Sequence, residues 1–219
     1  MEQKMLEVNF TRDQIPGVYT KKAPIYDLWG TLTESKARKI GLSRIGIRDG
    51  ESVLEVAAGT GLMFQEILKR NPNGRNVGVD VTEAMLEKAR EKAQATGVKS
   101  FELSVGDAYA LRFKDESFDV LVNNYMFDLL PEKDFEHVLG EFQRVLKKGG
   151  RLLMINMTHG KYFHQRFFEF LARSGPEMMG VCRGVELASR LPAAGFADVK
   201  REYVSQMGFP SEILTARRL

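Results

Sequence analysis

The sequence contains one cysteine, Cys182, and this scarcity excludes an internal disulfide and any zinc site built from cysteines. No stretch reaches the roughly 18 consecutive apolar residues that a transmembrane helix needs. The sequence also lacks a large excess of positive or negative charge. Its net charge of +3 over 219 residues is too small to indicate a nucleic-acid-binding surface. The charged N-terminus, MEQKMLEVNFTRDQ, lacks the apolar core of a signal peptide. We therefore expect a cytoplasmic protein with one α/β domain and no metal site.

What is present centres on the stretch SVLEVAAGTGLM, residues 52–63. Residues 53–56 form a short, nearly continuous apolar run, which is typical of a parallel strand buried on both faces. A turn of small residues, Ala57–Gly61, follows, and apolar residues then recur at helical spacing from Leu62 onward. Strand, glycine turn and helix together predict the first unit of a nucleotide-binding α/β sheet, in which free N–H groups of the helix point into the turn.

The spacing of the glycines identifies the kind of nucleotide. A dinucleotide site needs G-x-G-x-x-G, but its third glycine would fall on Phe64 or Leu62, which disfavours an NAD-dependent oxidoreductase. An acidic residue in the strand followed by A-x-G-x-G resembles motif I of the class I S-adenosylmethionine (SAM)-dependent methyltransferases, usually E/D-x-G-x-G-x-G. Alanine replaces the first glycine of that motif. The resemblance implies that SAM is the cofactor and that five residues bind it: Glu55, Ala57, Ala58, Gly59 and Gly61.

A second strand, predicted over residues 76–80, ends in Asp80, nineteen residues beyond Gly61. A carboxylate at the end of the second strand of a βαβ unit faces the ribose, where it can accept hydrogen bonds from both hydroxyls. Val81 and Met85 follow at the same end, and we include both in the predicted cofactor site, with core packing as the alternative role of Met85.

Further along the chain, the resemblance implies an adenine site after the third strand, predicted over residues 101–105. There, Asp107 would accept a hydrogen bond from the adenine amino group and the N–H of Ala108 would donate to the ring. Two later stretches, LRF-K-DESFD from Leu111 and VLKKGGRLLM from Val145, are similar to segments of the same methyltransferases.

The fourth strand, predicted over residues 118–123, brings Asn123, Asn124 and Tyr125 to the edge where open α/β sheets bind ligands. We expect the donor methyl group and the acceptor to meet there, with Asn123 and Asn124 on the cofactor side. The two prolines of an N-P-P-Y motif are missing, which argues against nucleic-acid and glutamine-amide acceptors. For a catalytic base the sequence offers His159, which follows the fifth strand, and Tyr125; His164 and Tyr162 are weaker alternatives.

Residues 1–47 are predicted to form an N-terminal arm and two cap helices, one beginning near Pro24 and one running from Thr33 to about Ser43. Residues 48–219 are predicted to form a SAM-binding methyltransferase domain that makes one compact unit with the cap. In the family that the chain resembles, such a helical segment lies over the cofactor. This resemblance implies that Tyr19 and Tyr26 contribute to the cofactor site, while plain amphipathic packing is the alternative.

The C-terminal part is predicted to contain an aromatic helix over residues 161–173, a helix over residues 184–194, and two strands joined in a hairpin around Gly208. The first helix either packs on the sheet, or lines a hydrophobic substrate pocket or rests on a membrane surface. The expected fold is α/β with a Rossmann-like, seven-stranded, mostly parallel sheet and an antiparallel last strand, and the resemblance implies the strand order 3-2-1-4-5-7-6. Helices cover both faces, and the cap forms an N-terminal helical extension.

The sequence therefore predicts a SAM-dependent methyltransferase that acts on a small or lipid-like acceptor, with peripheral membrane contact as one option. A SAM- or nucleoside-binding regulatory protein without catalysis is the alternative from another functional class. It would share Asp80 and Asp107 but would need no acceptor pocket beside Asn123 and Tyr125. The identity of the acceptor and the oligomeric state stay open at this point.

Overall fold

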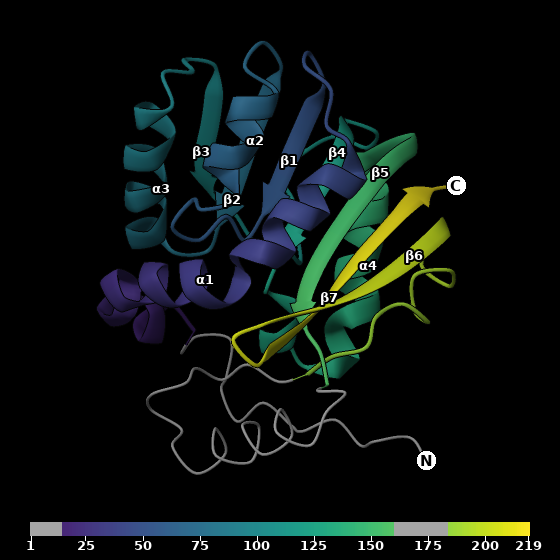
Figure 1. Ribbon diagram of the computed structural model, residues 1–219. Helices are drawn as coiled ribbons and strands as arrows, with labels where there is room; N and C mark the ends of the chain where they lie inside the picture. The colour runs from purple at the N-terminus through teal and green to yellow at the C-terminus, as the bar shows by residue number, and fades with distance from the viewer. Residues whose placement is uncertain (1–14, 160–183) are drawn as a thin grey trace.

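A computed structural model of the chain describes residues 15–159 and 184–219. Its centre is a sheet of order β3-β2-β1-β4-β5-β7-β6 (Figure 1). Neighbours from β3 through β5 run parallel, whereas β7 is antiparallel to both β5 and β6. This confirms the predicted fold and strand order. The strands are β1 (Ser52–Val56), β2 (Arg75–Asp80), β3 (Phe101–Val105), β4 (Phe118–Asn124), β5 (Leu146–Met157), β6 (Phe196–Gln206) and β7 (Phe209–Arg218).

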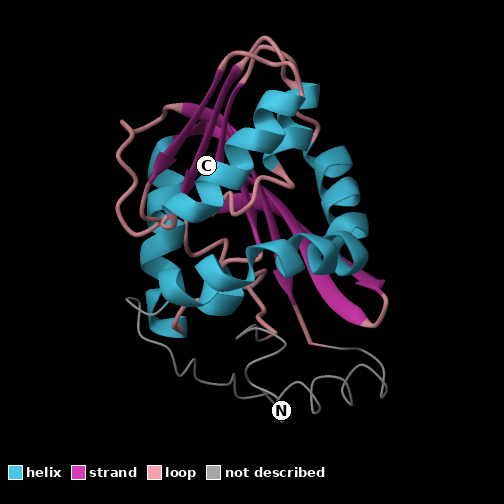
Figure 2. Ribbon diagram, turned by 90° about the vertical axis from the view of Figure 1, so that its left-hand side faces the viewer, coloured by secondary structure: helices cyan, strands magenta, loops and turns pink. Residues whose placement is uncertain are grey.

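Helices cover both faces of the sheet, as Figures 1 and 2 show. Because side chains alternate along a strand, β1 directs Val53 toward α1 and α2 and its neighbour Leu54 toward α4. Each face therefore buries its own apolar cluster, which explains the nearly continuous apolar sequence of β1 and β4. The helices are α1 (Ile15–Ile45), α2 (Phe64–Arg70), α3 (Glu83–Ala95) and α4 (Phe135–Val145), with short 3-10 turns η2 (Phe127–Leu129) and η3 (Glu132–Asp134) before α4.

Helix α1 corrects the prediction of two cap helices, because residues 15–45 form one helix that continues through Pro24 and Gly30. Packing against the sheet overrides these local breaking signals. At Gly41 the helix approaches β5 so closely that an added Cβ would lie 2.9 Å from Ile155 Cδ1. The Arg38 guanidinium donates to the Gly30 carbonyl at 2.9 Å and so supports the backbone where glycine weakens the helix. Figure 1 shows that α1 bends but does not end within this span.

The segment after the undescribed residues 160–183 also differs from the prediction. Residues 184–194 form irregular chain and successive turns rather than a helix. Pro192 lacks a backbone donor and Gly195 has a positive φ of 85°, so the local hydrogen bonds close turns and do not extend a helix. The apolar residues of the segment, Leu187 and Leu191 among them, are nevertheless buried on the α4 face. The predicted helix over residues 161–173 lies outside the described residues, as does Cys182.

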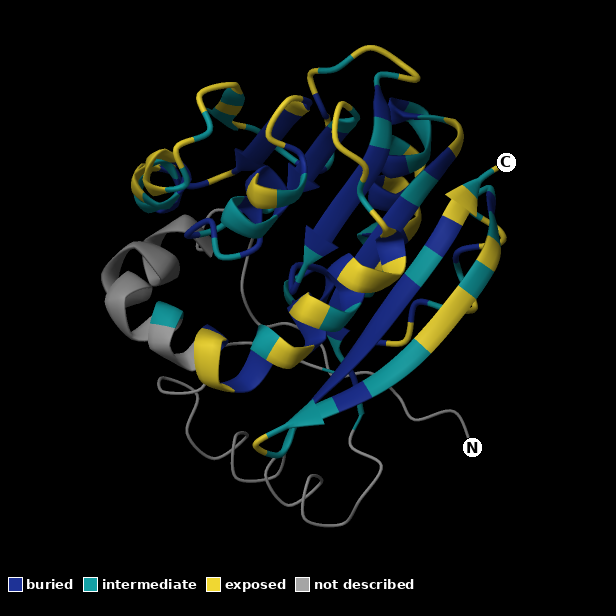
Figure 3. Ribbon diagram, turned by 45° about the horizontal axis from the view of Figure 1, so that its top comes forward, coloured by how far each residue is buried: buried dark blue, intermediate teal, exposed yellow. Residues whose placement is uncertain are grey.

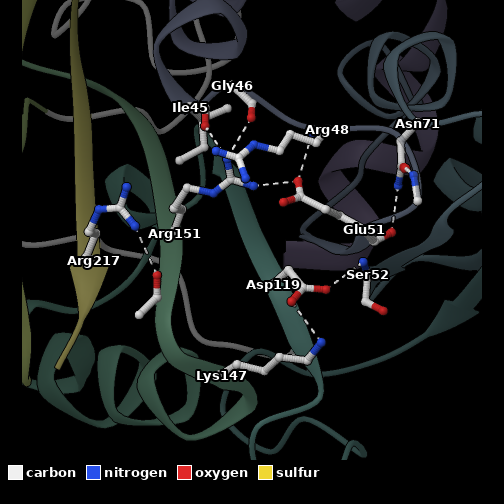
Figure 4. A network of polar contacts seen from close by, with 12 residues as sticks. Ile45, Gly46, Arg48, Glu51, Ser52, Asn71, Asp119, Lys147, Arg151 and Arg217 are labelled. Carbon is white, nitrogen blue, oxygen red and sulfur yellow. Dashed lines mark hydrogen bonds and ion pairs between the residues drawn. The ribbon is translucent and has the colours of Figure 1, made fainter.

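Ion pairs and hydrogen bonds tie the elements together at the amino-terminal edge of the parallel strands (Figure 4). Arg151, early in β5, donates to the carbonyls of Ile45 and Gly46 at 3.1 and 2.6 Å and pairs with Glu51. Asp119 in β4 accepts from Lys147 at 2.8 Å and from the Ser52 N–H at 2.9 Å. These contacts tie the end of α1 to β5 and join β4 to β1 and β5, and they leave the opposite, carboxyl edge for the site.

The burial of residues follows their place in the sheet. In Figure 3 the central strands are almost entirely buried, while the outer strand β6 has many exposed positions. Within the described residues, no helix combines the length and the hydropathy that crossing a membrane requires.

Candidate cofactor and active site

The glycine turn after β1 is built from left-handed backbone. Ala57, Gly59 and Gly61 have φ values of +61°, +53° and +84°. Gly61 has a second reason to lack a side chain, since a Cβ there would lie 2.7 Å from the Cα of Ala89 in α3. Ala58 anchors the turn to the neighbouring strand by donating its N–H to the Val79 carbonyl at 3.0 Å. The turn is thus held between β2 and α3, and nothing within 4 Å would meet a Cβ on Gly59.

Asp80 lies where β2 ends, beside this turn. Its Oδ2 accepts from the Gly59 N–H at 2.8 Å and its Oδ1 from the Thr82 N–H at 2.9 Å. Burial raises the pKa of the carboxyl group, and the backbone donors act against that rise. A carboxylate has about four lone-pair sites, so Asp80 can also accept from ribose hydroxyls.

The residues after Asp80 divide between surface and core. Val81 is 47% exposed and presents apolar surface at the carboxyl edge, which suits an adenine ring. Met85, in the first turn of α3, is buried in the protein interior. Both positions remain predictions as cofactor contacts, and the burial of Met85 matches its alternative role in core packing.

Asp107 and Ala108 follow β3 at the same edge. The Gly106 N–H donates to the Asp80 carbonyl at 2.9 Å, which brings the loop after β3 against the end of β2. Asp107 Oδ1 accepts from the Tyr109 N–H at 3.0 Å, as Asp does in a local turn, and Ala108 is buried. The structure therefore brings this pair next to Asp80, and their contact with adenine stays a prediction.

Three buried side-chain oxygens near the ends of β1 and β4 have no hydrogen-bond donor among the described residues: Glu55 Oε2, Asn123 Oδ1 and Asn124 Oδ1. Asn123 spends its amide N–H on the Val56 carbonyl at 2.9 Å, so its oxygen faces elsewhere. Burial raises the pKa of Glu55 well above its usual range, and the Asp80 charge adds to the effect. Buried acceptors without donors are rare in proteins, and a ligand with several N–H groups would satisfy them.

These features together fit SAM. The turn leaves room for close approach, Asp80 accepts from hydroxyls, Val81 offers apolar surface and the unpaired oxygens offer acceptors to an ammonium group. SAM would supply a sulfonium methyl group that is electrophilic without further activation.

Helix α1 contributes a residue that sequence reasoning did not select. Asp27 Oδ1 accepts from the Thr60 hydroxyl at 2.5 Å, and Asp27 Oδ2 pairs with Lys92 Nζ of α3 at 2.8 Å. Lys92 also donates to the Thr60 carbonyl at 3.0 Å. We call these three residues the cap contact. Asp27 directly follows Tyr26, a predicted cofactor residue, and this adjacency is the signal in the sequence that could have found it.

The N-terminal tyrosines are only partly described. The backbones of Tyr19 and Tyr26 lie in α1, while their side chains are outside the description. Their contact with the cofactor stays a prediction.

The two predicted catalytic residues occupy different environments. Tyr125 has a positive φ of 52°, and its hydroxyl is 2.6 Å from Ser211 Oγ in β7. Burial raises the pKa of Tyr125 well above its usual range, so the phenol keeps its proton at neutral pH. His159 is half-buried just beyond the end of β5, next to Gly184. Its role as a base stays a prediction, and His164 and Tyr162 lie outside the described residues.

Comparison with known proteins agrees with this geometry. The family model described as "Methyltransferase domain" matches residues 53–150. A demethylmenaquinone methyltransferase of Listeria monocytogenes is 30% identical, over 90% of this chain and 92% of its own length. The ubiquinone/menaquinone biosynthesis C-methyltransferase of Cereibacter sphaeroides is 32% identical over 66% of this chain and 59% of its own.

Among solved structures, the [4+2]-cyclase SpnF shares the fold with a TM-score of 0.75 at 18% identity, covering 95% of this chain and 97% of its own. At that identity the likeness concerns the fold, which hosts more than one chemistry. The family assignment rests on the full-length sequence relatives, and it decides against the NAD-dependent oxidoreductase. The chain belongs to the class I SAM-dependent methyltransferases.

Proposed function

We propose that this methyltransferase transfers the methyl group of SAM to a small, lipid-like acceptor, and that the acceptor is a hydroxylated quinone ring in its reduced form. The observation that carries the acceptor class is the full-length similarity to proteins named demethylmenaquinone methyltransferases. Apolar side chains after β4, Met126 and Leu130 among them, lie near the carboxyl edge and are compatible with such an acceptor.

The same proposal assigns roles to the residues of the site. Asp80 holds the ribose hydroxyls, Asp107 and Ala108 hold the adenine, and Glu55 with Asn123 and Asn124 provides acceptors for the amino-acid portion of SAM. Their task is to hold the methyl group in line with the acceptor atom, and such positioning alone is worth several powers of ten in effective molarity. Contact with a membrane surface through residues 161–173 stays a prediction, because that segment is not described.

Calorimetry and a transfer assay test this proposal in sequence. SAM and S-adenosylhomocysteine (SAH) are titrated first, and we expect micromolar binding of both. Methyl-labelled SAM is then offered with three acceptors: a short-chain demethylated naphthoquinol, vesicles of phosphatidylethanolamine and a simple aliphatic amine. Transfer to the naphthoquinol supports the proposal. Transfer only to the lipid head group or the amine would show that the acceptor class is wrong.

A further inference from the structure

The inward face of α1 changes character along its length. The helix runs antiparallel to β5, because Arg151 near the start of the strand contacts the Ile45 carbonyl, and Gly41 lies against Leu153 and Ile155. Over the strands this face is apolar, with Ala37, Leu42 and Ile45 buried. Two helical turns nearer the N-terminus, at about 1.5 Å per residue, it has passed the carboxyl end of β5. There the buried residues Thr33 and Glu34 are polar, and Arg38, one helical turn toward the C-terminus from Glu34, is buried as well.

Glu34 and Arg38 form a buried ion pair at this position, with residue exposures of only 5% and 6%. Glu34 Oε2 and Arg38 Nη1 are 2.9 Å apart, and Arg38 is anchored further by its bond to the Gly30 carbonyl. A Cβ on Gly30 would lie 3.2 Å from Glu34 Oε2 and 3.4 Å from Leu62 Cδ1. The carboxylate and the residue that follows the glycine turn therefore approach the same point of α1.

The charged groups around Glu34 come from several elements at the carboxyl edge. Arg38 on its own helix lowers the pKa of Glu34, whereas Asp128 in η2 raises it. Burial is the largest influence on the raised pKa values of Tyr125 and Glu55; the charge of Glu34 adds to the rise at Tyr125, which follows β4, and the charge of Arg38 acts against the rise at Glu55, near the end of β1. The ion pair thus lies among residues from the ends of β1 and β4, where the methyl group and the acceptor are expected to meet.

Among these groups, Glu34 is suited to exchange a proton at neutral pH. Burial, the largest influence, raises its pKa to about 7. Burial raises the pKa of Tyr125 well above its usual range, so its phenol keeps its proton there, and burial also raises the pKa of Glu55 well above its usual range. An ideal general base has a pKa near the working pH, and Glu34 meets this condition.

We propose that Glu34 accepts the proton that the methyl acceptor loses, and that Arg38 is the positioning residue that orients its carboxylate. This inference rests on the proposed function. The acceptor's proton moves to a Glu34 oxygen, and the electron pair left on the acceptor forms the bond to the methyl carbon. The electron pair of the broken C–S bond stays on sulfur, which leaves SAH, and Glu34 then releases its proton to water.

The first test compares Glu34→Gln and Glu34→Asp with Glu202→Gln, a matched control that removes the carboxylate paired with Arg44 at the exposed end of α1. The short-chain demethylated naphthoquinol is the acceptor. We expect Glu34→Gln to lower kcat by about 10²- to 10⁴-fold, with the Kd of SAM within about twofold of wild type. The rise of wild-type kcat near pH 7 should disappear, and Glu34→Asp should restore part of the rate. Equal kcat and pH profiles for Glu34→Gln and the control would overturn the proposal.

The second test needs no turnover. A phenol whose absorbance distinguishes its neutral from its ionised form is titrated into the SAH complex below the pKa of the free phenol. Wild type should ionise the bound phenol and Glu34→Gln should not; equal ionisation would contradict the role of Glu34. Folding of each variant is checked by its thermal unfolding. If wild type binds SAM but methylates only an amine or lipid, the proposed acceptor fails, while the phenol titration still decides the role of Glu34.

Discussion

Ala57 shows how one residue can depart from a motif and still take its shape. The position has a φ of +61°, the left-handed conformation that glycine adopts without a steric penalty. An L-residue with a side chain incurs about 1–2 kcal/mol there. The preference for glycine at the first position of motif I therefore has a conformational origin in this chain.

The substitution Ala57→Gly should consequently stabilise the protein. Relief of the left-handed conformation outweighs the extra chain entropy of glycine, about 0.5–1 kcal/mol, so we expect a net gain of up to about 1 kcal/mol. Urea unfolding measures the change. The neighbouring Ala58→Gly is the control, because Ala58 has no positive φ and should only lose stability. A loss at both positions would show that the strain at Ala57 is negligible.

Asp80 carries the second residue-scale prediction. Asp80→Ala removes a carboxylate that can accept from ribose hydroxyls and that also holds the Gly59 N–H. The loss of hydrogen bonds to a charged group should weaken SAM binding by at least about 1–2 kcal/mol, or about 5- to 30-fold. Calorimetric titration with SAM measures this. Glu102→Ala, an exposed carboxylate on β3, should leave the Kd unchanged. An unchanged Kd in Asp80→Ala would refute the ribose assignment.

Among the elements, the strands were predictable and one helix was not. Apolar runs that end in small or acidic residues identified β1 and β2, the alternation of strands with helices predicted a parallel sheet, and the family resemblance supplied the strand order. The extent of α1 could not be predicted, since Pro24 and Gly30 are local breaking signals and the helix nevertheless continues through both. The helix predicted over residues 184–194 was wrong for the opposite reason. Its apolar residues are buried, but the segment does not form a helix.

The residues of the candidate site likewise include some that the sequence predicts and others that it does not. Asp80 and Asn123 could be placed at the carboxyl edge because residues at strand ends meet at one edge in any parallel sheet, and Asp107 was placed there by the family resemblance. Asp27, Glu34 and Arg38 were missed, because their inward position depends on how α1 lies across β5. The position of α1 along β5 is set by tertiary packing, and it cannot be predicted from one amino-acid sequence alone.

The cap contact leads to a prediction at the scale of elements. Asp27→Ala disconnects α1 from both Thr60 and Lys92, so the glycine turn loses one of its supports. We expect about 2- to 10-fold weaker SAM binding, which corresponds to one partly buried, charge-assisted contact. Arg44→Met is the control, because it breaks a contact of α1 with Glu202 at the far end of the helix. Equal Kd values for the two variants would mean that the cap contact does not support the cofactor loop.

Across the whole molecule, charge is arranged differently at the two edges of the sheet. At the amino edge, partners lower the pKa of Asp119, as hydrogen bonds to Lys147 and the Ser52 N–H favour its charged form. At the carboxyl edge, burial raises the pKa of Glu34, Glu55 and Asp80. The amino edge therefore contributes stability, whereas the carboxyl edge keeps acids that are costly to ionise until a ligand meets them.

This arrangement predicts how stability depends on pH. Burial raises the pKa of Glu34 from 4.5 to about 7, so the folded protein binds this proton more tightly than the unfolded chain does. The stability from this site is fully present below about pH 4.5 and is lost as the pH rises through about 7. Its size is at most about 3 kcal/mol. Glu55 and Asp80 act with the same sign, whereas the lowered pKa of Asp119 takes effect only in more acidic solution.

Urea unfolding of wild type and Glu34→Gln from about pH 5 to about pH 8 separates the contribution of this one group. Glutamine imitates the protonated acid at every pH. Wild type should therefore lose stability relative to Glu34→Gln between about pH 5 and about pH 7, and the difference between the two proteins should become constant only above about pH 7. Parallel curves would mean that Glu34 is ionised throughout this range as a strong partner of Arg38. Its carboxylate would then have too low a pKa to act as the expected base at neutral pH.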